Sequence, residues 1–306
     1  MPLARIFNDT KKKAVLMTVL AGFLWGTSFP AIKIGLQFMD AYTFVFLRFL
    51  VASIALLVVA LLTKNLNFEI GNKRLILFLG LSNGVAYLLQ YVGMVSVAAS
   101  ESSLFVNLSA VWVAILSTLV LKERLGYKKW FGVTISFVGV ALITTNLNFA
   151  AIAKSNIIPD FLVISSGILW AVFTVYSKPM VRESKNIIKS MTWLMLFTML
   201  PLLPIGLFSA GAFILLPWNA WLAILYTAIF CWVIPYYLWL RGLKHISPVT
   251  SSVVLLTEIV VAVSISTIFL GEALTVASSF GAIFIMVAML LVSQADQSEN
   301  NASTIA

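Results

Sequence analysis

Long apolar segments separated by short polar connections dominate this chain. Most are about 18–26 residues long, which is enough for a helix to cross the roughly 30 Å hydrocarbon core of a bilayer. The predicted spans are, approximately, 14–36, 41–62, 75–98, 102–121, 130–145, 161–178, 187–209, 218–240, 247–270 and 274–292. The connections leave no room for a water-soluble domain. The pattern therefore predicts an all-α polytopic membrane protein with ten transmembrane helices.

Composition supports a membrane protein. Hydrophobic residues make up 61% of the chain, charged residues 10%, and the mean hydropathy is +1.04. A soluble domain carries about a quarter charged residues, so this chain lacks the polar residues to cover a water-facing surface. The first span is longer than a signal-peptide core and has no small-residue cleavage site, so we expect it to be retained. Residues 294–306 are polar and without apolar periodicity, which predicts a disordered tail.

A forty-residue unit occurs twice in the chain. Leu121–Leu125 reads Leu-Lys-Glu-Arg-Leu and is followed by Phe131-Gly132. Leu270–Leu274 reads Leu-Gly-Glu-Ala-Leu and is followed by Phe280-Gly281. Every matched pair is 149 residues apart. Such self-similarity at constant spacing indicates an internal duplication.

Lysine and arginine gather in alternate connections. They precede span one and lie between spans two and three, four and five, six and seven, and eight and nine, whereas the opposite connections contain only Lys154. Cytoplasmic loops carry the excess of basic residues. Both termini are therefore predicted to be cytoplasmic. The net charge of +9 is explained by this topology, so no nucleic-acid partner is expected.

The topology gives the duplication a geometric meaning. Five spans per repeat is an odd number, so the second copy must cross the membrane upside down. The basic residues of 122–129 are replaced in the second copy by Gly271, Ala273, Ala277 and Ser278, as a turn on the outer side requires. We predict two inverted five-helix repeats, residues 14–145 and 158–293, followed by a cytoplasmic tail over 294–306. Inverted repeats are typical of secondary transporters.

Three motifs resemble those of a known family. Trp25–Lys33 reads Trp-Gly-Thr-Ser-Phe-Pro-Ala-Ile-Lys, Leu47–Leu50 reads Leu-Arg-Phe-Leu, and the Leu-x-Glu-x-Leu turn is doubled. Together they resemble the EamA-type family of the drug/metabolite transporter superfamily, over all ten spans. The Trp-x7-Lys spacing recurs at Trp170 and Lys178, at an offset of 145. One position departs from the family pattern, because Glu258 is followed by Ile259 where a proline is common.

The resemblance implies a carrier in the plasma membrane that moves a small organic metabolite or an amphipathic, drug-like solute by alternating access, with export expected. It further implies that spans one to four and six to nine surround a central site, while spans five and ten are peripheral. A channel-like facilitator or a flippase for lipids or sugar conjugates would share these sequence features and is the alternative.

Three charged residues within the spans are candidates for transport chemistry, because charge inside a bilayer is costly and usually functional. Glu258 is the first, as a proton-coupling carboxylate or as a partner for a cationic group of the solute. A structural carboxyl, bonded to a neighbouring hydroxyl or to Arg48, is the alternative. Arg48 and Lys33 are candidate solute contacts that could instead reach the interface, and Arg48 could also donate to backbone carbonyls. Lys178, at the inner end of span six, is explained by the same snorkelling.

Aromatic and amide side chains deep in the spans could line a cavity for planar or amphipathic solutes through stacking and hydrogen bonds. A purely structural role in the core or against lipid is the alternative. Pro30 and Pro235 each remove a backbone donor and free the carbonyls of Gly26 and Cys231, which is tolerated where the backbone is buried or lines a wet cavity. The remaining candidates are Trp25, Asn83, Tyr87, Tyr91, Asn107, Trp170, Tyr176, Trp232 and Tyr236.

Other functional classes lack their motifs. An intramembrane enzyme would need paired aspartates or a His-Glu-x-x-His helix, and the chain has one histidine and one cysteine. Neither a metal site nor a cofactor is predicted. The expected partners are a small-molecule solute, the lipid bilayer and a proton as the candidate coupling ion.

Overall fold

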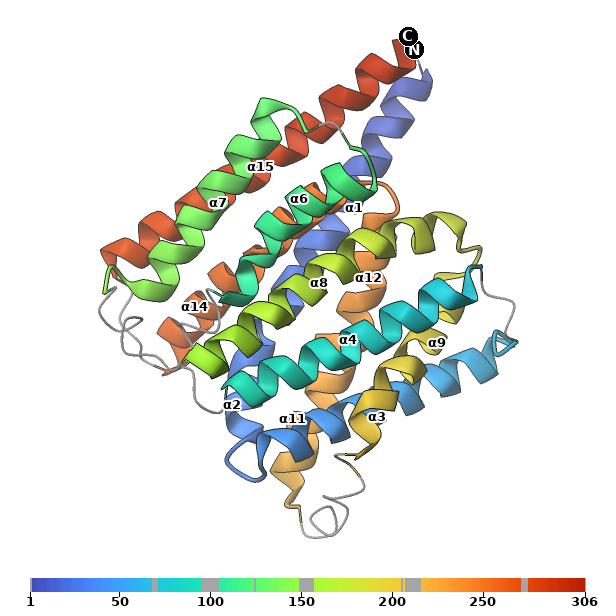
Figure 1. The fold of residues 1–306 in the computed structure, drawn as a ribbon, viewed down its shortest axis with the longest axis vertical. Coiled ribbons are helices and arrows are strands. Elements are labelled where there is room, and N and C mark those ends of the chain that lie inside the picture. Colours follow the sequence, from blue (N-terminus) through green and yellow to red (C-terminus); the bar gives the residue numbers. More distant parts are fainter. Residues whose placement is uncertain are drawn as a thin grey trace.

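The computed structural model describes residues 2–67, 71–94, 105–123, 125–148, 157–204, 206, 216–270 and 275–305. Every regular element among these residues is a helix, and the helices pack side by side into one elongated bundle (Figure 1). The first half contains α1 (Pro2–Gly26), α2 (Ser28–Gly35), α3 (Ala41–Leu62), α4 (Lys73–Met94), α6 (Ser109–Val120) and α7 (Tyr127–Thr145). The second half contains α8 (Ile157–Glu183), α9 (Ile187–Met199), the 3-10 helix η2 (Leu200–Leu202), α11 (Trp218–Ala228), the π-helix η4 (Ile229–Val233), α12 (Ile234–Leu243), α13 (Pro248–Leu255), α14 (Thr257–Leu270) and α15 (Val276–Ile305).

Six described helical segments are long and apolar enough to cross a membrane. They are Ala41–Leu62, Lys73–Gly93, Ile158–Glu183, Trp218–Leu243, Pro248–Ile265 and Val276–Ala295, with shorter apolar helices at Phe105–Val120 and Ile187–Leu202. An all-helical, polytopic architecture agrees with the sequence prediction. The count of ten spans and the cytoplasmic position of the termini stay predictions.

Side-chain caps explain where several of these helices begin. Asp40 accepts hydrogen bonds from the backbone N–H groups of Tyr42 and Thr43 at the start of α3, and Ser247 accepts from the N–H of Thr250 at the start of α13. Such caps satisfy helix donors that have no intrahelical partner. Partial burial alone would raise the pKa of Asp40, but the hydrogen bonds from Thr43 and Tyr42 outweigh it and hold the pKa below its usual value of 3.8.

The end of α15 differs from the sequence prediction. We expected residues 294–306 to be disordered, whereas α15 continues as a helix through Ile305. No glycine or proline interrupts residues 294–305. Adding residues to an existing helix costs far less than nucleating one, so a polar segment without a helix breaker continues the preceding apolar helix.

Glycine contacts show the duplication in three dimensions. Gly93 of α4 packs against Pro159 and Val163 of α8. Gly242 of α12 packs against the residues that match these two at the offset of 145, namely Ala14 and Thr18 of α1. Because Gly93 and Gly242 are themselves matched at 149, the same helix contact occurs once per repeat, with the first helix of each repeat packed on the third helix of the other.

The contact between α7 and α15 relates the two repeats by inversion. Gly132 packs against Ala288 and Val292, whereas Gly139, further along α7, packs against the earlier residue Gly281. The two helices therefore run antiparallel, side by side (Figure 1). They are equivalent helices of the two repeats, since Gly132 matches Gly281 and Gly139 matches Ala288 at the offset of 149. Antiparallel equivalents are the relation that inverted repeats require.

Labelling of matched positions is expected to report the inversion directly. Tyr127 and Val276 open α7 and α15, are 149 residues apart, and are 80% and 74% exposed. In a Cys231→Ser background, Tyr127→Cys is expected to react with a membrane-impermeant maleimide in inside-out vesicles only. Val276→Cys is expected to react in right-side-out vesicles only. Reaction of both from one side would contradict the inverted arrangement.

Candidate functional site

Glu258 lies beside a break in the ninth apolar span. The helix stops at Leu255 and restarts at Thr257. The N–H of Leu256 donates to Val253 O at 3.2 Å and that of Ile259 to Leu256 O at 3.0 Å, so tight three-residue bonds replace the α-helical pattern. The break needs no proline. The Thr257 hydroxyl donates to the Val254 carbonyl at 2.9 Å, and such back-bonding competes with the helix ladder and bends helices.

Helix α1 supports this break through two glycines. A Cβ on Gly22 would overlap Thr257 Oγ1, and a Cβ on Gly26 would lie 2.6 Å from the carbonyl oxygen of Glu258. Small residues let the backbones of membrane helices approach this closely. The position of Glu258 is therefore set by direct backbone packing between α1 and α14, and its side chain is half-buried.

Within the described part of the chain, the carboxyl of Glu258 forms neither a hydrogen bond nor an ion pair. The salt bridge to Arg48 considered from the sequence is not formed, and the adjacent Thr257 hydroxyl is engaged with a backbone carbonyl. Both structural explanations for a carboxyl at this depth therefore lack support among the described residues.

Arg48 of α3 is also buried, with 5% of its surface exposed. Its Nη2 donates to the carbonyl oxygen of Cys231 at 3.1 Å, and its guanidinium carbon lies 5.8 Å from the centre of the Phe49 ring. Cys231 belongs to η4, the π-helix just before Pro235, so the carbonyl that Pro235 was predicted to free is the one that Arg48 binds. Of the two alternatives to a solute contact, the structure shows donation to a backbone carbonyl and not an extension to the membrane interface.

Aromatic rings from α1, α3, α4, α8, η4 and α12 meet next to Arg48, and we call this group the aromatic cluster. Trp232 and Tyr236 stack with their centroids 4.4 Å apart. Tyr87 contacts both Phe49, at 4.6 Å, and Trp170, at 5.2 Å. The members are Trp25, Phe49, Tyr87, Trp170, Phe173, Trp232, Tyr236 and Trp239.

The cluster joins the two charged residues. Tyr87 interacts electrostatically with both Arg48 and Glu258. Two polar atoms of the cluster are buried without a hydrogen-bond partner, the indole nitrogen of Trp232 and the hydroxyl of Tyr236. The Trp232 N–H approaches the Tyr87 hydroxyl but does not form a hydrogen bond of good geometry. The aromatic cluster therefore combines unsatisfied polar groups with one neighbouring cation, Arg48, and one carboxyl, Glu258.

The structure gathers five of the predicted aromatic residues in the cluster and adds three that are not among the predicted site residues, Phe49, Phe173 and Trp239. Phe49 follows Arg48 directly, and Phe173 lies one helical turn after Trp170. Phe173 shares the helix face of Trp170, which is the signal that would have found it, whereas adjacent helical residues point in different directions and Phe49 has no such signal. The predicted members are Trp25, Tyr87, Trp170, Trp232 and Tyr236.

The other predicted residues lie elsewhere. Asn83 joins two helices by donating to Thr198 Oγ1 at 3.3 Å. Tyr91 is buried in the core, and Tyr176 packs edge-on against Phe78. The side chain of Asn107 is half-buried just before α6. The side chains of Lys33 and Pro30 fall outside the described part of the structure.

Lys178 has a structural role that the sequence analysis did not predict. Its Nζ donates to the carbonyl oxygens of Leu243 at 2.6 Å, Lys244 at 3.3 Å and Ile246 at 2.5 Å. The side chain is 4% exposed, so it does not snorkel. It binds the carbonyl groups at the end of α12, where the partial negative charge of a helix lies, and ties α8 to the α12–α13 connection.

His245, the single histidine of the chain, lies in that connection. Partial burial disfavours its charged form, and the neighbouring charges of Lys178, Lys244 and Arg241 add to this effect, so its pKa lies below the usual value of 6.5. As the pH falls below 6.5, the unfolded chain takes up the proton first. The titration of His245 therefore lowers the stability of the folded protein progressively as the pH falls from 6.5 to the lowered pKa of the folded state.

Titration of ¹³C-labelled histidine by NMR is expected to place the His245 pKa below 6.5. Arg241→Gln removes one repelling charge and is expected to raise this pKa. Lys185→Gln changes an exposed lysine of the α8–α9 connection, outside the group of charges that act on His245, and as the matched control is expected to leave this pKa unchanged. A value at or above 6.5 in the parent protein would rule out this account.

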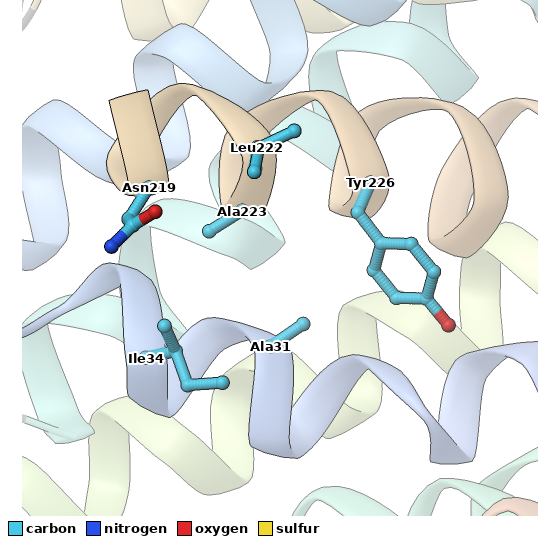
Figure 2. Close-up of a pocket in the computed structure, with 6 residues that line it drawn as sticks. All are labelled: Ala31, Ile34, Asn219, Leu222, Ala223 and Tyr226. Atoms are coloured by element: carbon cyan, nitrogen blue, oxygen red, sulfur yellow. The ribbon is translucent and has the colours of Figure 1, made fainter. Parts of the chain in front are cut away.

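A pocket of about 240 Å³ opens between α2 and α11 (Figure 2). It is lined by Ala31, Ile34, Asn219, Leu222, Ala223 and Tyr226. At its edge the Tyr226 hydroxyl is hydrogen-bonded to Thr27 Oγ1 at 2.9 Å, and Thr27 Oγ1 lies 3.7 Å from Cys231 Sγ. Since the carbonyl of Cys231 accepts from Arg48, a short chain of contacts connects this pocket with the aromatic cluster.

A bundle of apolar helices with charged side chains beside helix breaks has the architecture of a membrane transporter. Comparison with known proteins identifies the family. Residues 12–145 and 157–294 each match the EamA-like transporter family, so the chain belongs to that family and contains two copies of its domain.

Relatives and a solved structure cover nearly the same length. An uncharacterized transporter of Archaeoglobus fulgidus is 31% identical over 236 residues, 76% of this chain and 81% of the relative. A protein of Salmonella typhimurium named "Probable amino-acid metabolite efflux pump" is 27% identical over 290 residues, 92% of this chain and 94% of the relative. A solved crystal structure at 15% identity superposes with a TM-score of 0.75 over 94% of this chain and 98% of its own length, which shows the same fold.

Proposed function

We propose that the protein is a secondary carrier of the plasma membrane that exports a small organic metabolite by alternating access. The observation that carries this proposal is the aromatic cluster, whose Tyr87 interacts electrostatically with both a buried cation, Arg48, and a carboxyl, Glu258, neither of which has an ion-pair partner among the described residues. Placing such groups in a bilayer costs several kcal/mol, a cost that fits a site used by a solute and a coupling ion. Export is favoured by the name of the Salmonella relative.

Three helix breaks are the proposed hinges of the alternating-access movement. Span one bends at Thr27, span eight passes through η4, and span nine is interrupted at Leu256. Each break lies next to Arg48, Glu258 or the cluster. Helices α2 and α11 pack together beyond the first two breaks and form the proposed outer gate. The hydrogen bond between Thr27 and Tyr226 holds this gate closed.

Glu258 is the proposed coupling residue. A carboxyl that takes up a proton when it faces outside and releases it when it faces inside exchanges an entering proton for a departing solute. Its place beside the Leu256 break means that a change in the angle between α13 and α14 alters its surroundings.

Solute exchange in proteoliposomes tests the carrier mechanism. Purified protein is expected to accumulate labelled solute transiently when vesicles are preloaded with unlabelled solute, and the initial rate is expected to saturate. Non-saturating flux without counterflow would identify a channel-like facilitator. Movement of labelled lipid between leaflets with no solute exchange would identify a flippase.

The proposed gate makes a separate prediction. Tyr226→Phe removes the hydroxyl that bonds Thr27 and nothing else, so the gate is expected to open more often, and a cysteine at Ala223 in the Cys231→Ser background is expected to react faster with a maleimide from outside. Tyr127→Phe, at an exposed position remote from the gate, is the control. An unchanged labelling rate in Tyr226→Phe would show that the hydrogen bond does not close the gate.

A further inference from the structure

We propose that Arg48, Trp232 and Tyr236 form a recognition site for a carboxylate group of the transported solute. This inference rests on the proposed carrier function and adds the chemical class of the solute. Trp232 and Tyr236 lie about one turn apart on the consecutive helices η4 and α12, and the fold brings Arg48 of α3, which is distant in sequence, to them at the aromatic cluster.

Each of the three residues has a polar atom without a hydrogen-bond partner. These atoms are the Nε of Arg48, the Nε1 of Trp232 and the hydroxyl of Tyr236. All three side chains are buried, with exposed fractions of 5%, 0% and 4%. Nearly all buried polar groups in proteins are hydrogen-bonded, and an exception calls for an explanation such as a missing ligand.

Direct contacts place these groups close together. Arg48 is bonded to the carbonyl of Cys231, which is the residue before Trp232. The Trp232 ring stacks on Tyr236 and meets the edge of Phe49, the residue after Arg48. A chain of contacts therefore links the three residues in one part of the bundle, where α3 packs on η4.

The chemistry of these groups selects the ligand. A guanidinium and an indole N–H can only donate hydrogen bonds, and a phenol hydroxyl can donate one. A cluster of donors that includes one permanent positive charge matches a group with several acceptor lone pairs and one negative charge. A carboxylate fits this description, and arginine binds it in a two-pronged geometry. The surrounding rings then favour a flat or aromatic acid.

A purely structural role for Arg48 explains less. Its bond to Cys231 satisfies the carbonyl that Pro235 leaves without a helix partner, and this bond uses only Nη2. It does not account for the unpaired Nε, for the unpaired atoms of Trp232 and Tyr236, or for a charge that no described acid neutralises. A carboxylate would satisfy all of these at once.

Three probes that share one ring and one chain length test the inference, namely 3-phenylpropionate, 3-phenylpropionamide and 3-phenylpropylamine. Binding to the full-length protein in detergent is measured by calorimetry at pH 7.5. A charge-assisted hydrogen bond in a buried site corresponds to an affinity ratio of about tenfold or more. The propionate is expected to bind at least about tenfold more tightly than the amide, and the amine more weakly than the propionate.

Variants assign the preference to the site. Arg48→Gln is expected to reduce the ratio between propionate and amide to about twofold or less, whereas Arg241→Gln, at an exposed arginine bonded to Tyr237, is expected to leave it unchanged. Trp232→Phe and Tyr236→Phe each remove one donor and keep a ring, so each is expected to lower the ratio about threefold while the affinity for the amide stays the same. These two variants keep the test valid if Arg48→Gln does not fold.

Equal affinities for propionate and amide in the parent protein would overturn the inference, as would a preference that survives both Trp232→Phe and Tyr236→Phe. If the protein exchanges neutral or cationic solutes saturably but shows no carboxylate preference, the carboxylate site is wrong and the carrier stands. If no solute is exchanged at all, the proposed function itself is wrong.

Discussion

Glu258→Gln is expected to retain solute exchange and to lose the accumulation that a pH gradient drives. Glutamine keeps the size and hydrogen-bonding groups of the protonated side chain but cannot release a proton. With one proton exchanged per solute, a gradient of one pH unit supports about a tenfold concentration ratio. The parent protein is expected to approach that ratio, and the variant to stay near one.

The measurement uses proteoliposomes with an imposed pH gradient, and counterflow at equal pH serves as the test of folding and exchange. Glu183→Gln is the matched control, because Glu183 is an exposed carboxylate at the end of α8 and the change is chemically identical. Full pH-driven accumulation in Glu258→Gln would make Glu258 a structural carboxyl and would move coupling to another group, or remove it. Glu258→Ala is expected to be worse than Glu258→Gln in exchange, because it also leaves a cavity.

The sequence predicts the features of these contacts that depend on the duplication or on simple backbone chemistry. The offsets of 149 and 145 relate the contact of Gly93 with Val163 to that of Gly242 with Thr18. The missing N–H of Pro235 identifies Cys231 as the residue with a free carbonyl, and Arg48 binds that carbonyl. The offsets and the missing N–H follow from the sequence alone, whereas the tertiary fold decides that Arg48 is the donor to Cys231.

Features that arise from tertiary packing were not predictable in the same way. The break at Leu256 occurs without the expected proline, since a threonine hydroxyl and the close approach of Gly22 take its place. Asn83 could have faced a cavity or a helix, and only the position of Thr198 decides between them. The sequence shows that a polar residue within an apolar span is unusual, but it does not show which residue the polar side chain contacts.

Lys178 illustrates the same limit and gives the second prediction of large effect. Sequence position suggested a lysine that extends to the membrane surface, whereas its ammonium group binds the carbonyl oxygens of three residues around the end of α12. Lys178→Met keeps the length of the apolar stem and removes every donor. Each buried carbonyl left without a partner costs about 1–3 kcal/mol.

One opposing effect reduces that loss. Methionine removes the desolvation penalty of a buried ammonium group, which can make the replacement of buried charges neutral or even favourable when the partners are replaced as well. Here the partners are backbone carbonyls and cannot be replaced, and two of the three bonds, those to Leu243 and Ile246, are fully buried. The unsatisfied carbonyls should therefore dominate, with a net loss of about 3 kcal/mol.

Thermal unfolding in detergent is the measurement, followed by tryptophan fluorescence, and the Tm of Lys178→Met is expected to fall by several degrees. Lys185→Met makes the same change at an exposed lysine of the α8–α9 connection and is expected to leave the Tm within about one degree, since surface substitutions rarely exceed 0.5 kcal/mol. Equal Tm values for the two variants would mean that the three carbonyl groups are satisfied without the lysine. A lowered Tm with normal solute exchange would place Lys178 in the scaffold, holding α8 against the α12–α13 connection without taking part in transport.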